Sequence, residues 1–264
     1  MRTAENPLIG APPADVPLAH PPLIRVIAQV RFPPLLSLAS QDSIAPFQTR
    51  LLERYPILRP EVTYNVVLDE RAPVESKQIK YWRFLDKDNN WAVTLGTDFI
   101  SIETTRYTNR KDFLERFHDV LATCQELYSP AAVDRLGIRY INRITDPLLQ
   151  DLPTLVRPEV LGIAATPLVH HAEHAMTQNV FQFDDGFLGA RWGILPPQRS
   201  VDPAAIDPID RRSWVLDLDA YSTQIPTFEA QEAVAKAQRF TERIYAFFRW
   251  TVTDEFLRRH GGAV

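Results

Sequence analysis

The sequence predicts an α+β fold made of two pseudo-repeated units, each with the element order strand, helix, four strands and long helix (β-α-β4-α). Two observations predict this architecture. Residues 23–31 (LIRVIAQVR) and 137–144 (GIRYINRI) are similar strand-like runs, and each is followed by a proline and two leucines, at Pro34 and Pro147. Similar periodicities then follow in the same order in both halves, as expected for an internal duplication. We therefore expect an antiparallel sheet with its long helices packed on one face.

The first unit is expected over residues 23–130, after a proline-rich, extended and weakly ordered arm over residues 1–22. Alternation of apolar and polar residues predicts a strand over 23–31, with Val26, Ala28 and Val30 on its apolar face. Helical spacing predicts a short helix over 40–55 and a long one over 110–128, capped by Thr108 or Asn109. The other expected strands are 62–69, 79–85, 91–95 and 99–104.

The second unit is expected over residues 131–264. It begins with a strand over 135–144, followed by a poorly patterned helix or loop over 148–161 that is broken by prolines. A long helix is expected from Thr227 to about Trp250, and Thr253 is the candidate cap of a last short helix. The four strands between them are expected at 168–176, 179–183, 187–194 and 214–219. The proline-rich stretch 196–212 is a long loop, a length that often carries function.

Composition limits the classes of function. The chain has 264 residues, 45% hydrophobic residues and a formal net charge of −4, so nonspecific nucleic-acid binding is not expected. No apolar run is long enough for a membrane span, and the first 22 residues lack the apolar core of a signal peptide. The single cysteine, Cys124, lies on the apolar stripe of the 110–128 helix, which predicts a core residue. These features favour a cytoplasmic protein.

A basic strand face is the principal candidate site. Opposite their apolar faces, the two related strands carry the following polar residues: Arg25, Gln29 and Arg31 in the first, and Arg135, Arg139 and Arg143 in the second. Alternate residues share one face of a strand, so each set forms a stripe. Planar guanidinium groups bind carboxylate or phosphate through paired hydrogen bonds, which predicts an anion-binding surface. The alternative interpretation is a structural face whose arginines pair with nearby carboxylates.

Two further clusters are weaker candidates. His170 and His174 with Glu173 match the H-x-x-E-H pattern of inverted zinc peptidases, but that pattern requires a helix, and the surrounding residues predict a strand. Asp217 and Asp219 alternate on one strand face, where they could pair with Arg191 on a neighbouring strand or bind Mg²⁺. Asn142 lies on the apolar face of the strand 135–144, where a buried side-chain amide needs partners, and this predicts a structural hydrogen bond.

The chain also resembles known proteins in two respects. The element order over residues 23–250 resembles the tandem unit of the TATA-box binding protein fold and the wider helix-grip group, which implies that the first strands of the two halves meet at a pseudo-dyad. The strand 136–144 (LGIRYINRI), the segment 216–219 and the Phe-rich last helix are similar to a sporadically distributed prokaryotic family of about this length. That family implies no activity and no catalytic residue, and its scattered occurrence would suit a defence accessory.

The sequence therefore favours a binding protein over an enzyme, with an anionic ligand or an acidic partner segment on the basic face and no cofactor. No Walker loop, dinucleotide fingerprint or nucleophile elbow is present in the sequence. The alternatives are a metal-assisted hydrolase using His170 and His174 or Asp217 and Asp219, and a structural homo-oligomer whose concave face another subunit closes.

Overall fold

The computed structural model describes residues 6–67, 75–225 and 227–263. It is a mixed α and β structure with a large sheet, and in the described ranges no helix is both long enough and apolar enough to cross a membrane. The strands are β1 (Leu23–Arg31), β2 (Ile57–Val67), β3 (Glu75–Leu85), β4 (Trp91–Leu95), β5 (Phe99–Thr104), β6 (Val133–Ile144), β7 (Ala175–Phe183), β8 (Gly186–Leu195) and β9 (Ser213–Ile225). The α-helices are α1 (Gln41–Leu51), α2 (Arg110–Tyr128), α3 (Leu152–Leu155), α4 (Pro158–Leu161), α5 (Ala230–Thr251) and α6 (Asp254–Arg259).

Hydrogen-bonded neighbours follow the order β2-β3-β4-β5-β1-β6-β9-β8-β7, so the first strands of the two halves, β1 and β6, are adjacent. The ladders from β2 to β5 and from β7 to β9 are antiparallel. The chain divides into two compact units. Unit 1 comprises residues 1–26, 137–222 and 235–264, and unit 2 comprises residues 27–136 and 223–234.

The helices α1 and α2 of unit 2 lie where the helical spacing of apolar residues predicts them. Ile44 and Phe47 of α1 are buried, and Phe47 packs against Phe84 of β3 with ring centroids 5.5 Å apart. The helix α2 begins at Asn109, whose side chain accepts a hydrogen bond from the Asp112 backbone N–H at 2.9 Å and so satisfies a terminal donor. Its Phe113 stacks on Trp91 of β4. The predicted cap at Asn109 is confirmed.

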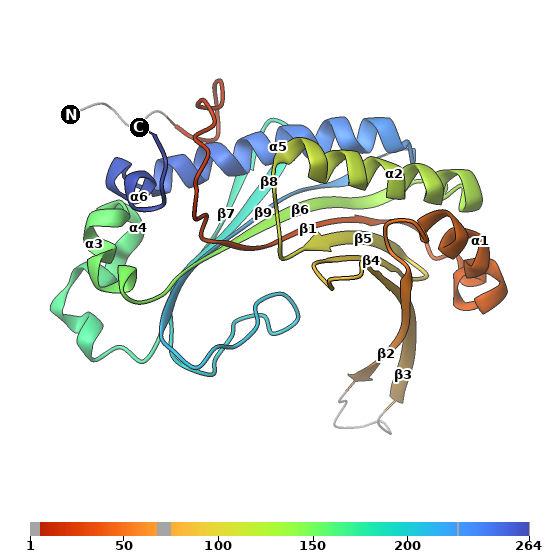
Figure 1. Cartoon of the computed structure of the whole chain (residues 1–264), viewed down its shortest axis with the longest axis horizontal. Coiled ribbons are helices and arrows are strands. Elements are labelled where there is room, and N and C mark those ends of the chain that lie inside the picture. Colours follow the sequence, from red (N-terminus) through yellow and green to blue (C-terminus); the bar gives the residue numbers. More distant parts are fainter. Residues whose placement is uncertain (1–5, 68–74, 226, 264) are drawn as a thin grey trace. The chain divides into compact units, whose positions relative to one another are not determined.

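In unit 1, the part of α5 from residue 235 onward packs on β7 and β8. Phe247 contacts Phe181 of β7 and Trp192 of β8, at 5.5 and 6.3 Å between ring centroids, and Phe240 contacts Phe183 at 5.8 Å. The loop between β8 and β9 lies on the other side of these strands (Figure 1). One sheet face of unit 1 is therefore covered by a helix and the opposite face by a loop.

The N-terminal arm docks on the last helices of unit 1 from residue 6 onward; residues 1–5 lie outside the described residues. The Val16 N–H donates to the Tyr245 hydroxyl at 2.8 Å, and the His20 N–H donates to the His260 carbonyl at 3.0 Å. A Cβ on Gly262 would lie 2.9 Å from side-chain atoms of Val16 and Leu18, so this glycine permits close approach of the arm. Residues 7–10 of the arm form turns, residues 11–18 carry no helix or strand, and hydrogen bonds hold the arm at several points.

Several predicted boundaries are corrected. Residues 168–174 of the expected strand 168–176 are not a strand, because Pro167 begins a 3-10 helix, Pro167–His170, and β7 begins only at Ala175. Proline suits the first turn of a helix, and Arg212 donates to the carbonyls of Val169 and Ala172 at 3.1 and 3.0 Å. The second half therefore has three strands after its helical segment, in place of four. In the first half β2 begins five residues early, at Ile57, and the expected end of this strand at residues 68–69 lies outside the described residues.

Candidate functional site

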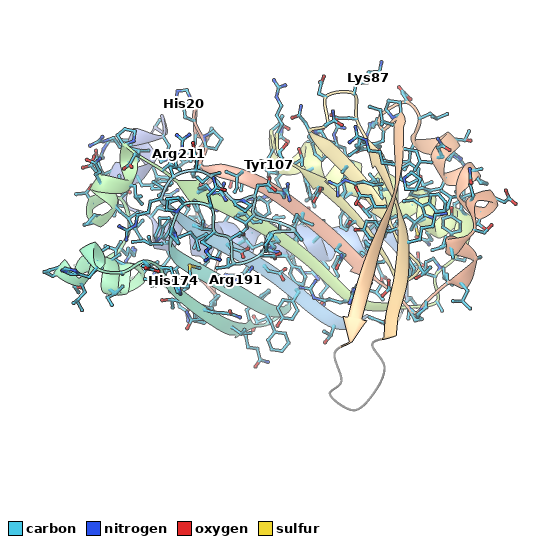
Figure 2. All side chains as sticks on the ribbon, turned by 90° about the horizontal axis from the view of Figure 1, so that it is seen from below. His20, Lys87, Tyr107, His174, Arg191 and Arg211 are labelled. Atoms are coloured by element: carbon cyan, nitrogen blue, oxygen red, sulfur yellow. The ribbon has the colours of Figure 1, made fainter. Side chains whose placement is uncertain are left out.

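The six predicted basic-face residues divide between the two units. Arg25, Arg139 and Arg143 belong to unit 1, and Gln29, Arg31 and Arg135 belong to unit 2. In unit 2, Arg31 lies 3.8 Å from Asp98, with both side chains about half exposed. The unit 1 arginines meet a fourth, Arg191 of β8, which is labelled in Figure 2. We call Arg25, Arg139, Arg143 and Arg191 the arginine face.

Asp217 of β9 orients two of these arginines. Its carboxylate accepts hydrogen bonds from Arg139 Nε at 2.7 Å and Nη2 at 2.9 Å, and from Arg191 Nε at 3.0 Å and Nη2 at 2.6 Å. Residues 191 and 217 are directly opposite in the β8–β9 ladder, which confirms the predicted ion pair. The Asp217 side chain is only 3% exposed. Asp217 therefore holds the guanidinium groups of Arg139 and Arg191 in fixed orientations.

The loop between β8 and β9 supplies a second, outer carboxylate. We call residues 196–212 the covering loop; it follows Leu195 and ends at Arg212, and its Arg211 is labelled in Figure 2. Arg139 Nη1 donates to Asp202 Oδ2 at 2.8 Å, and Arg191 Nη2 lies 3.6 Å from the same oxygen. Asp202 is 30% exposed, far more than Asp217. Two oriented guanidinium groups thus converge on one accessible carboxylate.

The other two arginines contact the same loop. Arg25 donates to the Ala204 carbonyl at 3.0 Å and to the Asp207 carboxylate at 3.3 Å, and Arg143 donates to the Asp207 carbonyl at 2.7 Å. Asp207 is 73% exposed, whereas Arg25 is 14% exposed. Exposed carboxylates form weak ion pairs because water competes for both partners. The ion pair between Arg25 and Asp207 is therefore more easily replaced than the buried pair between Arg139 and Asp217.

Protonation equilibria reflect this arrangement. Burial by itself would lower the pKa of Arg139, but hydrogen bonds and charge attraction from Asp217 and Asp202 outweigh it and raise the pKa. For Asp202, partial burial would raise the pKa, but the nearby guanidinium groups, Arg139 first, hold it below its ordinary value. Burial is the main cause that lowers the pKa of Arg143. The Nε atom of Arg143 is buried without a hydrogen-bond partner, so this arginine is incompletely satisfied.

Local structure also holds the covering loop in place. Its base is closed by the Gln198 N–H, which donates to the Ile209 carbonyl at 2.7 Å. The N–H groups of Ala205 and Ile206 both donate to the Asp202 carbonyl, at 3.0 and 2.8 Å, and both side chains are buried. The covering loop is thus held by its own backbone hydrogen bonds and by two buried apolar side chains.

The weaker candidates have different environments. His170 ends a 3-10 helix and His174 is exposed just before β7, so the predicted strand arrangement of the histidine cluster is wrong. Asp219 lies opposite Gly189 in the β8–β9 ladder. Over the described ranges, no group of three or more His, Cys, Asp or Glu side chains is placed to hold a metal ion. Asn142 is buried and donates to the Leu216 carbonyl at 3.4 Å, as predicted.

Sequence reasoning missed the acidic half of this site. Asp202 and Asp207 lie in a segment that the sequence marked only as a long, proline-rich loop. Both aspartates precede a proline, and both occur near the middle of a long stretch that lacks strand or helix periodicity. That placement was the available signal, because acidic residues in a long loop are candidates for contact with a basic strand face.

No protein-family model matches the sequence, and no curated protein is significantly similar to it. Function is therefore inferred from the geometry of the arginine face and the covering loop.

Proposed function

We propose that this chain is a binding protein, not an enzyme, and that the arginine face of unit 1 receives an acidic polypeptide segment of a partner. One observation supports this most strongly: all four arginines of the face direct their side chains at residues 202–207 of the covering loop. The face thus already accommodates one acidic peptide segment, that of its own chain.

Charge supports the same proposal. Four guanidinium groups stand against one buried carboxylate, Asp217, which compensates only part of their positive charge. Asp202 and Asp207 compensate two of these charges. A partner with more or better-placed carboxylates would gain charge-assisted hydrogen bonds from guanidinium groups that Asp217 already orients. The covering loop therefore occupies the arginine face in the way the partner segment would. It also competes with that segment for the face.

The proposed experiment uses a variant with both loop carboxylates neutralised, Asp202→Asn with Asp207→Asn, which keeps the shape of the loop. Titration calorimetry would measure binding of a synthetic peptide with the sequence of residues 198–209 (QRSVDPAAIDPI). We expect the double variant to bind the peptide and the unaltered protein to bind it much more weakly, because a tethered loop competes at a high effective concentration.

Two controls make the binding specific to the arginine face. A peptide with Asn at positions 202 and 207 should not bind. Arg25→Gln, added to the double variant, should weaken binding because both hydrogen-bond partners of Arg25 within the described ranges lie in the covering loop, whereas Arg31→Gln in unit 2 should not. Equal binding of the acidic and the neutral peptide, or no effect of Arg25→Gln, would contradict the proposal.

The proposal also covers the origin, the family and the cellular location of the chain. We infer an internal duplication with a boundary near residue 130, supported by the adjacency of β1 and β6 and by the antiparallel ladders β2–β5 and β7–β9. We also infer membership of the scattered prokaryotic family that the strand 136–144 resembles, an accessory role in defence, and a cytoplasmic location that suits a single buried cysteine.

A further inference from the structure

The outer edge of strand β7 is a second surface with an unusual composition. In unit 1, β7 is the last strand of the sheet order, and among the described residues only β8 pairs with it. Figure 2 labels His174, the residue just before this strand. An edge strand presents unpaired backbone N–H and C=O groups along its length, and these groups can pair with a further strand.

This edge lacks the features that normally prevent edge pairing. The nine residues of β7 (AMTQNVFQF) include no charged residue and no proline, and the side chain of Val180 is 59% exposed. The strand at the other end of the sheet order, β2, carries Arg59, Pro60 and Glu61. Charges and proline on an edge strand disfavour intermolecular pairing. The sequence therefore protects the β2 edge and leaves the β7 edge open.

We propose that β7 pairs with β7 of a second copy of this chain, antiparallel, about a two-fold axis at Asn179. Two-fold pairing of a strand with itself always centres on one residue. Centring the pair on Asn179 places large side chains of one copy opposite small side chains of the other. It places Ala175 opposite Phe183 of the second copy and Thr177 opposite Phe181. Each large ring, already packed on α5 through Phe240 or Phe247, thus meets a small side chain.

Hydrogen bonding at the two strand ends favours the same register. Residue 174 is then opposite residue 184 of the second copy, so the exposed His174 imidazole can donate a hydrogen bond to the exposed Asp184 carboxylate, twice in the dimer. The next carboxylate, Asp185, is already paired with Arg239 of its own α5 at 2.8 Å. Centring the pair on Val180 instead would place Met176 opposite Asp184 and lose this contact. The edge is therefore complementary to itself in backbone, in side-chain size and in hydrogen bonding.

The interaction surface is independent of the proposed function, because the arginine face does not take part in it. A pair of strand edges is smaller than the roughly 1,600 Å² of a standard stable interface. The dimer is therefore expected to be weak and reversible, with dissociation in the micromolar range.

Sedimentation velocity over a dilution series tests the association. The unaltered chain is expected to shift from monomer to dimer as its concentration rises. Val180→Lys, which places a charge on the open edge, should raise the dissociation constant at least about tenfold, while the uncharged β-branched control Val180→Thr should not. A chain that stays monomeric throughout, or a dimer that Val180→Lys leaves intact, overturns the proposal. A chain that stays monomeric and pairs through β7 only with other proteins also overturns the proposal.

Cysteine cross-linking tests the register, since the native Cys124 is buried. Asn179→Cys should form an intermolecular disulfide under mild oxidation, because directly opposite residues of an antiparallel pair lie within disulfide distance. Mixing Gln178→Cys with Val180→Cys should give a mixed cross-link, and each alone should give much less. Preferential cross-linking of Val180→Cys with itself would overturn the register centred on Asn179.

Discussion

Asp217 and Arg139, on neighbouring strands of unit 1, form a two-point ion pair: both carboxylate oxygens accept from the guanidinium group, at 2.7 and 2.9 Å. This geometry fixes the plane of the guanidinium group and directs its remaining nitrogen, Nη1, at Asp202. The inner carboxylate therefore sets the direction in which the outer one is bound. Arg191 adds a second guanidinium group to the same inner carboxylate.

Replacing the inner carboxylate should destabilise the protein. Asp217→Asn leaves two guanidinium groups without their buried counter-charge, and we expect a loss of about 3 kcal/mol in the free energy of unfolding, measured by urea titration. The matched control is Asp210→Asn on the covering loop, where the aspartate is 75% exposed and the loss should be below about 0.5 kcal/mol. Equal stability of the two variants would contradict a structural role for the inner pair.

The contribution of Asp202 should depend on pH in one direction. Because its pKa in the folded protein lies below the ordinary value of 3.8, its stabilising effect is present above that value and is lost as pH falls through the lower folded pKa. The stability difference between the unaltered chain and Asp202→Asn should therefore be constant from about pH 5 to pH 8 and shrink below pH 3.8. Thermal unfolding of both proteins across this range measures it, and a difference that grows on acidification would refute the assignment.

The regular elements could be predicted from the sequence because their signals are local. Alternation gave β1 its full extent, and the cap at Asn109 with its apolar stripe gave both ends of α2. The β2 boundary failed because Pro60 argues against a strand, yet a proline is tolerated at the sheet edge where β2 lies. Residues 168–176 failed because their conformation depends on Arg212, some forty residues away.

The candidate site was only half predictable for the same reason. The arginines occur at alternating positions in a strand and can be recognised from that spacing alone. Their partners are separated from them by long stretches of chain: Ala204 and Asp207 contact Arg25, and Asp202 contacts Arg139. No periodicity encodes which irregular loop covers a sheet face, so the closing of this face required the tertiary structure.

A glycine in β8 should be essential for the β7–β8 ladder. Gly193 has a φ of 148°, and a Cβ at this position would lie 1.9 Å from the Ala175 carbonyl oxygen. Gly193→Ala should therefore cost about 2–4 kcal/mol and expose the amides of β7 to hydrogen exchange. On the same strand, Gly189→Ala is the control, because its nearest contact would be an ordinary 3.7 Å. Similar stability of the two variants would argue against this strand pairing.

The single cysteine should be chemically silent in the folded protein. Cys124 is fully buried on α2, and burial raises the pKa of its thiol to about 12. Since the thiolate is the reactive form, we expect labelling by a thiol reagent at pH 8 to follow the rate of unfolding. The rate should rise to that of a small-molecule thiol in urea. Prompt labelling of the native protein would contradict the predicted core position.

Hydrogen exchange on the covering loop, with the acidic peptide added to the Asp202→Asn, Asp207→Asn variant, tests most directly whether loop and partner compete for the arginine face. If they do, peptide binding will accelerate exchange at the Ala205 and Ile206 amides, which donate to the Asp202 carbonyl in the unaltered chain, while the amides of β9 around Leu216 stay protected. Peptide binding that leaves the loop amides unchanged would show that the acidic segment binds elsewhere and would contradict the proposed role of the arginine face.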